Sequence, residues 1–347
     1  MPFSTLLTLA VCFSSLAFCY LPSSPHRRSA WKDLPSIPIT PRQEHSTVFL
    51  PPDTLAIIGG IYPNGTQFPP PTTPIMQFYS ISRARWTTRA PLPGALNHIN
   101  AAVVGGKIYV LGGLAVAEAP YAWRATSDSW IYDPEQDAWE TIPGPTAAAM
   151  RGSAAVGVYR GKIFLAGGMR DLETLPDGLQ SSDSSVLAFD TKTRKWLELP
   201  AAARNMPAAR DHASCAVVGH KMYVVGGRDH GQVNVRGTVF VLDLENLEAG
   251  WTTSSASMPT PRGGLAAGLI GTKIYTFGGE GNTAVESGVF NNTEVYDTAT
   301  DSWEILPPMK LPRHGTQAFG IRGVVYLPGG ALLQGAGPLA DFDAFVP

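Results

Sequence analysis

The chain has 347 residues, of which 44% are hydrophobic and only 16% are charged, and its formal net charge is −2 at pH 7. Its many glycines (36) and prolines (30) disfavour long helices and suit short strands joined by tight turns. No basic run exceeds Arg27-Arg28, which argues against a nucleic-acid surface or an anionic membrane surface as partner.

The N-terminal stretch differs from the rest of the chain. Residues 6–18 are mostly apolar but too few to span a bilayer, which is typical of a secretory signal peptide. We therefore expect a signal peptide over residues 1–19, a linker over 20–30, and a secreted protein. Glycosylation sequons at Asn64 and Asn291 agree with this expectation. Only three cysteines are present, so no disulfide framework is expected.

An internal repeat occupies the remainder of the chain. Six glycine pairs follow short β-rich apolar runs at intervals of 51 to 59 residues. These pairs are Gly59-Gly60, Gly112-Gly113, Gly167-Gly168, Gly226-Gly227, Gly278-Gly279 and Gly329-Gly330. An aromatic-Asp pair and a Trp seven residues later recur between them, as in Tyr132-Asp133 with Trp139, and Tyr296-Asp297 with Trp303.

The double glycine, the aromatic-Asp pair and the spaced Trp resemble the signature of the kelch family. The resemblance covers residues 31–347 and implies blades of four antiparallel strands around a central channel. A single blade is too small to bury both its faces, so neighbouring blades must stack. The recurring Trp and Tyr side chains are expected to fill the space between blades.

The two ends of the repeat region complement each other. The last repeat has Phe342-Asp343 but no following Trp, whereas residues 31–35 (Trp-Lys-Asp-Leu-Pro) match the sequence at Trp303. We therefore predict an all-β fold, a six-bladed kelch β-propeller closed by an N-terminal strand. Such closure removes the open sheet edges that promote aggregation.

The innermost strand of each blade should line the channel, and polar residues recur just before it. Sixteen residues before each first glycine stand Arg151, Arg210, Arg262 and Arg313, and fourteen before stand His45, His98 and His212. The residues that stand fifteen positions before the first glycine of a pair include Glu44, Asn97, Asp211 and His314. Equal phase predicts that they encircle one channel mouth. We assign as catalytic candidates Arg151, Arg210, His212, Arg262, Arg313 and His98.

The loops after the glycine pairs should open at the same mouth. Together with His45 and His314 from the channel, they supply the candidate substrate-binding residues Tyr121, Trp123, Arg170 and His230. Arg228 and Glu280 lie in equivalent loops. Aromatic walls with Arg and His donors are typical of a small-molecule site. The arginines could instead tie blades together, and the two aromatics could simply pack within their loop.

No metal and no other cofactor is expected. Histidines in phase could ligate a metal, but these come from separate blades with no local ligand spacing. The hydrolase elbow, the zinc-protease motif and the phosphate-binding glycine loop are all missing from the sequence.

In size, signal peptide, blade number and pocket character the chain is similar to secreted fungal hetero-Diels-Alderases. That resemblance implies a cofactor-free enzyme of secondary metabolism that joins a tropolone-type o-quinone methide to a humulene-like polyene. An alternative is a carbohydrate-active propeller similar to a sialic acid epimerase, in which arginines clamp a carboxylate and Glu44 or Glu280 moves a proton. A further alternative is a non-catalytic kelch interaction module. The expected partner is a small-molecule substrate. We expect no binding of nucleic acid, no membrane association once the signal peptide is removed, and no evident protein partner.

Overall fold

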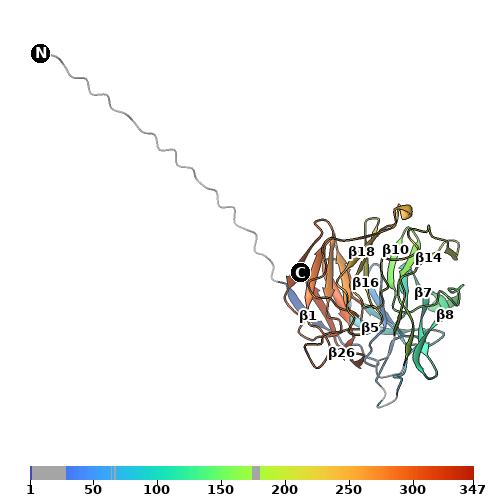
Figure 1. Cartoon of the computed structure of the whole chain (residues 1–347). Coiled ribbons are helices and arrows are strands. Elements are labelled where there is room, and N and C mark those ends of the chain that lie inside the picture. The colour runs from blue at the N-terminus through green and yellow to red at the C-terminus, as the bar shows by residue number, and fades with distance from the viewer. Residues whose placement is uncertain (2–28, 64, 66–67, 174–179) are drawn as a thin grey trace.

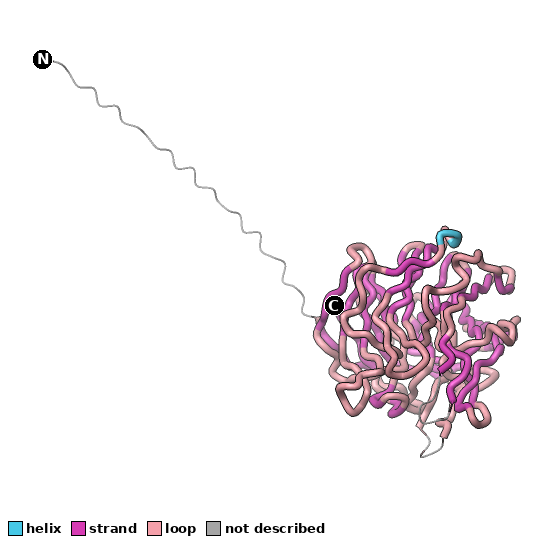
Figure 2. The backbone as a smooth tube through the Cα atoms, in the orientation of Figure 1, coloured by secondary structure: helices cyan, strands magenta, loops and turns pink. Residues whose placement is uncertain are grey.

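A computed structural model describes residues 1, 29–63, 65, 68–173 and 180–347, and its described strands form six antiparallel blades. Within these residues the only helix is a 3-10 turn, η1 (Leu247–Ala249) (Figure 2). None of the helical structure described is long and apolar enough to cross a bilayer. The expected signal peptide, most of the expected linker and Asn64 lie outside the described residues.

Four blades are regular, with strands in chain order from the inside outward. Blade 1 contains β2 (Ser46–Leu50), β3 (Thr54–Ile58), β4 (Met76–Ser80) and β5 (Arg85–Arg89). Blade 3 contains β10 (Ala155–Tyr159), β11 (Lys162–Ala166), β14 (Val186–Asp190) and β15 (Lys195–Leu197). Blade 4 contains β16 (Ser214–Val218), β17 (Lys221–Val225), β18 (Val239–Asp243) and β19 (Trp251–Thr253). Blade 5 contains β20 (Ala266–Ile270), β21 (Lys273–Phe277), β22 (Thr293–Asp297) and β23 (Ser302–Leu306).

Blade 2 is extended by its neighbour. It contains β6 (Ala101–Val104), β7 (Lys107–Val116), β8 (Tyr121–Asp133) and β9 (Ala138–Thr141), and β7 and β8 run well past their glycine pair. The loop of blade 3 forms β12 (Met169–Glu173) and β13 (Gln180–Ser182), and β12 pairs with β8. Leu172 lies opposite Trp123 in this pairing. The loops of two blades therefore make one sheet.

Blade 6 is built from both ends of the chain, as the sequence predicts. It contains β24 (Phe319–Ile321), β25 (Val324–Pro328), β28 (Phe342–Val346) and the N-terminal β1 (Ala30–Leu34). Trp31 lies opposite Phe345, and in Figure 1 the blue β1 joins the red C-terminal strands. A hairpin of β26 (Ala331–Leu333) and β27 (Ala336–Pro338) follows the last glycine pair.

The repeat residues hold adjacent blades together. The Trp139 ring lies 5.0 Å from the Tyr132 ring, and its indole N–H donates to the carbonyl of Ala90 in the chain leaving blade 1, 3.0 Å away. The glycine pairs allow close approach between blades: Gly278 has φ 56°, and a Cβ there would lie 2.0 Å from the Arg313 carbonyl oxygen. A side chain at this position would both strain the backbone and separate the blades.

Candidate functional site

One residue from each blade forms a closed ring around the propeller axis. Each has a left-handed backbone (φ 48–63°), and each backbone N–H donates to the carbonyl of the corresponding residue in the preceding blade at 2.7–3.3 Å. The members, which we call the axial ring, are Glu44, His98, Ser153, His212, Gly264 and Gly315. A non-glycine residue in this conformation is uncommon, and four of them here are held by the hydrogen bonds.

The axial ring closes one end of a cavity of about 130 Å³ that continues along the inner strands. Its wall beyond the ring mixes apolar side chains such as Val156, Ala267 and Phe319 with polar ones such as Ser46, Thr47 and Gln317. A cavity of about 150 Å³ can hold benzene, so this space suits a single ring-sized group. On the other side of the axial ring, six buried residues form bridges with the residues after the glycine pairs: Gln43, Asn97, Gly152, Asp211, Gly263 and His314.

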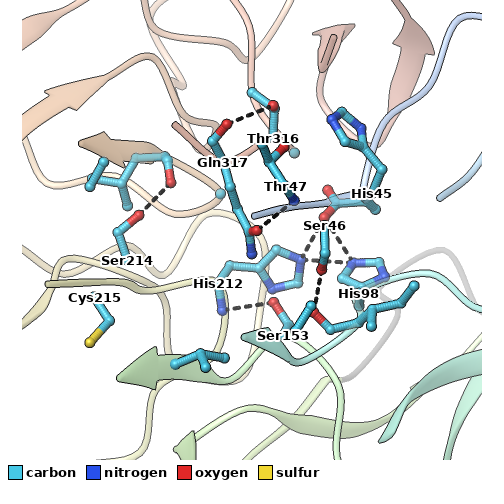
Figure 3. Close-up of a pocket in the computed structure, with 18 of the residues that line it drawn as sticks. His45, Ser46, Thr47, His98, Ser153, His212, Ser214, Cys215, Thr316 and Gln317 are labelled. Carbon is cyan, nitrogen blue, oxygen red and sulfur yellow. Dashed lines mark hydrogen bonds and ion pairs between the residues drawn. The ribbon is translucent and has the colours of Figure 1, made fainter. Parts of the chain in front are cut away.

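His98 and His212 face each other at this closed end (Figure 3). Their Nε2 atoms lie 3.0 Å apart, and Glu44 Oε2 lies 3.3 Å from the first and 3.9 Å from the second. His98 Nδ1 lies 2.5 Å from Asn97 Oδ1, and His212 Nδ1 lies 2.6 Å from Asp211 Oδ1. Because the Asn97 amide donates to Thr72, its oxygen faces His98. Both histidines are thus positioned to donate from Nδ1 and to leave Nε2 toward the axis.

A buried ionic network supports the pair. Arg228 binds Asp211 (Nε to Oδ1, 2.9 Å) and Glu280, and its Nη2 lies 2.9 and 3.0 Å from the two ring nitrogens of His212. Burial alone would raise the pKa of Asp211, but Arg228 and the hydrogen bond from His212 lower that pKa to about 2. Burial lowers the pKa of His98 well below its usual value, and the positive charge of Arg228 lowers that pKa further.

The four predicted arginines do not line the cavity, which corrects their expected placement. Arg151, Arg262 and Arg313 each donate from Nη1 to the carbonyl of the first glycine of their own blade, at 3.1, 2.8 and 3.3 Å. Arg210 instead binds the Ala209 carbonyl and Thr238 and lies over Phe240. All four are buried inside the blades because their guanidinium groups satisfy carbonyls at the strand ends.

His45 is also misplaced by counting from the glycines. Blade 1 carries one more residue in the turn between β2 and β3 than blade 3 does between β10 and β11, so Glu44, rather than His45, takes the position of His98 and His212. His45 is among the residues that line the cavity, but it is only 3% exposed and packs against Gly329, between blades 6 and 1. Burial, with a smaller contribution from the charge of Arg42, lowers the pKa of His45 to about 3, so it is a neutral packing residue.

The loop candidates lie on the far side of the axial ring from the cavity. Trp123 is buried with Ile61, Leu114 and Met169, and its ring lies 6.4 Å from that of His98. Tyr121 is half-buried with the Arg124 guanidinium 4.7 Å over its ring. The other loop candidates, Arg170 and His230, are exposed.

His314 does join the site. Its Nε2 hydrogen-bonds the Leu333 carbonyl at 2.8 Å, and its Nδ1 lies 3.5 Å from Glu280 and 3.7 Å from Glu44. Of the predicted site residues, the structure thus brings together His98, His212 and His314, with Trp123 covering them.

Sequence reasoning missed Ser153. It placed Glu44 and Asp211 at the channel mouth and Arg228 and Glu280 in the loops, but gave a role only to Glu44 and Glu280, in the carbohydrate alternative. Counting back from the glycine pair also gives Ser153, but in blade 1 only the buried arginine gives the ring position. Arg42 makes the same bonds in blade 1, to the Gly59 and Ile75 carbonyls. Counting two residues forward from Arg42, Arg151 and Arg210 gives Glu44, Ser153 and His212, which are the ring positions.

Comparisons with known proteins agree with this architecture. The kelch motif matches residues 96–146 and 150–201, and a kelch-repeats domain described as KLHDC2/KLHL20/DRC7 matches residues 177–330. The chain is 39% identical to Kelch-like protein terF of Aspergillus terreus over 91% of this chain and 68% of the relative. It is 29% identical to human Kelch domain-containing protein 3, over 71% of this chain and 66% of the relative. The solved structure of YjhT superposes with a TM-score of 0.69 at 17% identity, covering 90% of this chain and 95% of that one.

Proposed function

This chain belongs to the kelch-repeat propeller family, and from that premise we propose that it is a small-molecule enzyme whose reaction takes place in the axial cavity. The observation that carries the proposal is the facing pair His98 and His212 at the closed end of a cavity whose wall is partly apolar and partly polar. A concave site with a small number of precisely placed polar groups is the usual form of a small-molecule site.

The reaction we propose is a hetero-Diels-Alder cyclisation of fungal secondary metabolism. A hydroxymethyl tropolone would enter with its oxygens toward His98 and His212. The proton of the ring hydroxyl would pass to the hydroxymethyl group, which leaves as water, and this net loss of one water gives the neutral o-quinone methide. The cavity holds only one ring-sized group, so a humulene-like polyene would meet the bound ring at the end of the cavity away from the axial ring, and cycloaddition would form one C–C and one C–O bond. Holding both partners in one orientation supplies most of the acceleration in such a step.

The carbohydrate-active alternative loses its main support. A sugar acid needs free arginines to clamp its carboxylate, but Arg151, Arg210, Arg262 and Arg313 are buried on partners within the blades. Arg228 reaches the site, yet Asp211 and Glu280 already engage it.

The interaction-module alternative has one observation in its favour. Large apolar side chains are exposed on the loops that follow the glycine pairs of five blades: Phe68, Val116, Val233, Val285 and Leu333. Exposed apolar clusters mark many protein-binding faces. Saturable capture of one partner through this face, with no turnover of any small molecule, would favour this alternative.

The test incubates purified protein with a hydroxylated tropolone and humulene and separates the products by chiral chromatography. We expect one stereoisomer to dominate, and His98→Gly to slow product formation by about 100-fold or more. His230→Ala, which removes an exposed histidine outside the cavity, should change the rate by less than about twofold. Product ratios equal to those without protein would refute the cyclase proposal. Consumption of a sugar acid by the same preparation would support the epimerase alternative.

Secretion and N-glycosylation belong to the same proposal. Asn291 is exposed, between the strands of blade 5, and is therefore accessible to the glycosylation machinery.

A further inference from the structure

The geometry points to a metal site that the repeat pattern does not predict: Glu44, His98 and His212 bind one divalent transition-metal ion, and Zn²⁺ fits best. This inference goes beyond the proposed reaction, because it concerns the metal ion that the axial ring binds. It does not depend on the identity of the substrate.

The three ligand atoms have the spacing that a small metal ion needs. The two histidine Nε2 atoms lie 3.0 Å apart, and Glu44 Oε2 lies 3.3 Å from that of His98 and 3.9 Å from that of His212. Zinc binds imidazole nitrogen and carboxylate oxygen at about 2.0–2.2 Å, which in a tetrahedron places ligand atoms about 3.4 Å apart. Small rotations of the three side chains therefore suffice. Two histidines and one carboxylate also form a common ligand set of zinc enzymes.

The hydrogen bonds at the Nδ1 atoms of His98 and His212 orient the rings so that both Nε2 atoms face the proposed metal position. Asp211 and Asn97 each accept from an Nδ1–H, which assigns the unprotonated nitrogen of both rings to Nε2. Two Nε2 lone pairs 3.0 Å apart repel each other unless a proton or a metal ion lies between them. Metal-binding histidines characteristically have such oxygen partners on the other ring nitrogen.

The charges around the ring also call for a cation. Three buried or nearly buried carboxylates, Glu44, Asp211 and Glu280, surround the site, and Arg228 is the guanidinium that pairs with two of them. The three carboxylates outnumber the one guanidinium by two. Uncompensated charge is costly in a buried site, and one divalent ion neutralises it.

Arg228 does not occupy the metal position. Its Nη2 is almost equally far from both nitrogens of His212, 2.9 and 3.0 Å, which places it over the ring face rather than in the ring plane. The Nε2 lone pair lies in that plane, and it remains directed toward His98 and Glu44. The charge of Arg228 is already matched by Asp211 and Glu280.

The remaining coordination position faces the cavity. The axial ring lines the cavity, so a bound ion would reach a water molecule or a substrate oxygen there. An open position of this kind distinguishes a catalytic zinc site from a structural one.

The variants that test the site come from the ring itself. Gly264 and Gly315 occupy the ring positions of blades 5 and 6, so His98→Gly and Glu44→Gly introduce a residue suited to the left-handed backbone. Ser153→Gly makes the same change in blade 3 without removing one of the three ligands, and is the matched control.

The experiment titrates untagged, chelator-treated full-chain protein with Zn²⁺ by isothermal calorimetry, and with Co²⁺ to follow the visible absorption of a four-coordinate complex. We expect one ion per chain in wild type and in Ser153→Gly. In His98→Gly and Glu44→Gly we expect at least about 100-fold weaker binding and loss of the Co²⁺ absorption. Circular dichroism before titration identifies any variant that fails to fold, and Glu44→Gln then replaces it.

Two results would overturn the inference: no saturable binding by folded wild type, or equal binding by wild type and His98→Gly. Failure of this inference is distinguishable from failure of the proposed reaction. Metal binding without cyclisation refutes only the reaction, and cyclisation by protein that binds neither ion refutes only the metal site.

Discussion

The buried arginines show how a single residue holds a blade together. Arg262 donates to the Gly278 and Asn292 carbonyls at 2.8 and 3.0 Å and pairs with Glu294 at 2.8 Å. Both side chains of this pair are fully buried. The arginine satisfies carbonyl groups that the strands leave open at their ends, and Glu294 offsets its charge.

We predict that Arg262→Met destabilises the fold by about 3–5 kcal/mol, because it leaves the Glu294 carboxylate and the Gly278 carbonyl buried without their partner. Equilibrium denaturation in urea measures the difference. Arg170→Met, at an exposed arginine, is the control and should change the free energy of unfolding by less than about 0.5 kcal/mol. A loss below about 1 kcal/mol in Arg262→Met would contradict this structural role.

Residue roles were the part of the site that sequence reasoning predicted least well. The phase of the repeat correctly brought His98 and His212 together, because both blades have the same spacing between ring and glycine pair. The phase failed at His45, because one additional residue in blade 1 puts Glu44 in the axial ring and leaves His45 as a packing residue. It failed at the arginines because a side chain near the axis can point along the blade as readily as into the channel. The repeat period predicts where a residue lies along the propeller axis, but it does not predict the direction of the side chain.

At the scale of elements, β1 is the strand on which closure depends. The Trp31 ring lies 5.4 Å from that of Phe277 and 5.0 Å from that of Phe345, so it contacts both blade 5 and blade 6. This strand was predictable because the missing Trp of the last repeat could be matched to the first. The β12 and β13 hairpin was not, because its pairing with β8 depends on two loops meeting in space, which no local pattern encodes.

We expect Trp31→Ala to destabilise the protein by about 3 kcal/mol, through loss of packing against both phenylalanines. Thermal and urea unfolding would both report the change. The neighbouring Lys32→Ala, whose side chain is exposed on the same strand, should have little effect. Equal stability of the two variants would mean that β1 adds only backbone hydrogen bonds to blade 6.

At the scale of the whole molecule, the strands at the two ends of the propeller, β1 and β28, pair like the two strands of a β-hairpin that lacks its connecting turn. Ala30 lies opposite Val346 in an antiparallel pair, in the same relation as the two outer strands of the other blades. The ring of blades is therefore continuous in space, although the chain is interrupted there.

This continuity predicts that a circular permutant folds. Joining Pro347 to Ser29 through a short glycine-rich turn, with new termini in the exposed loop at Gly231–Asn234, should give the same far-ultraviolet circular dichroism as the wild type. Its melting temperature should be at least as high, because a local turn replaces a contact between distant chain ends. A matched permutant opened within β17, a buried strand, should fail to fold. If both permutants behave alike, the ends are not equivalent to a blade hairpin.

The pairing of β1 with β28 also sets an order of events during synthesis. Among the described strands β1 is made first and β28 last, and at about 5–20 residues per second they are separated by roughly tens of seconds. Throughout that interval β1 lacks its partner strand, and Trp31 lacks Phe345. A nascent chain that stops short of residue 342 never acquires the partner. The ring of blades thus cannot close until β28 has been made, and a product truncated before β28 keeps an unpaired β1.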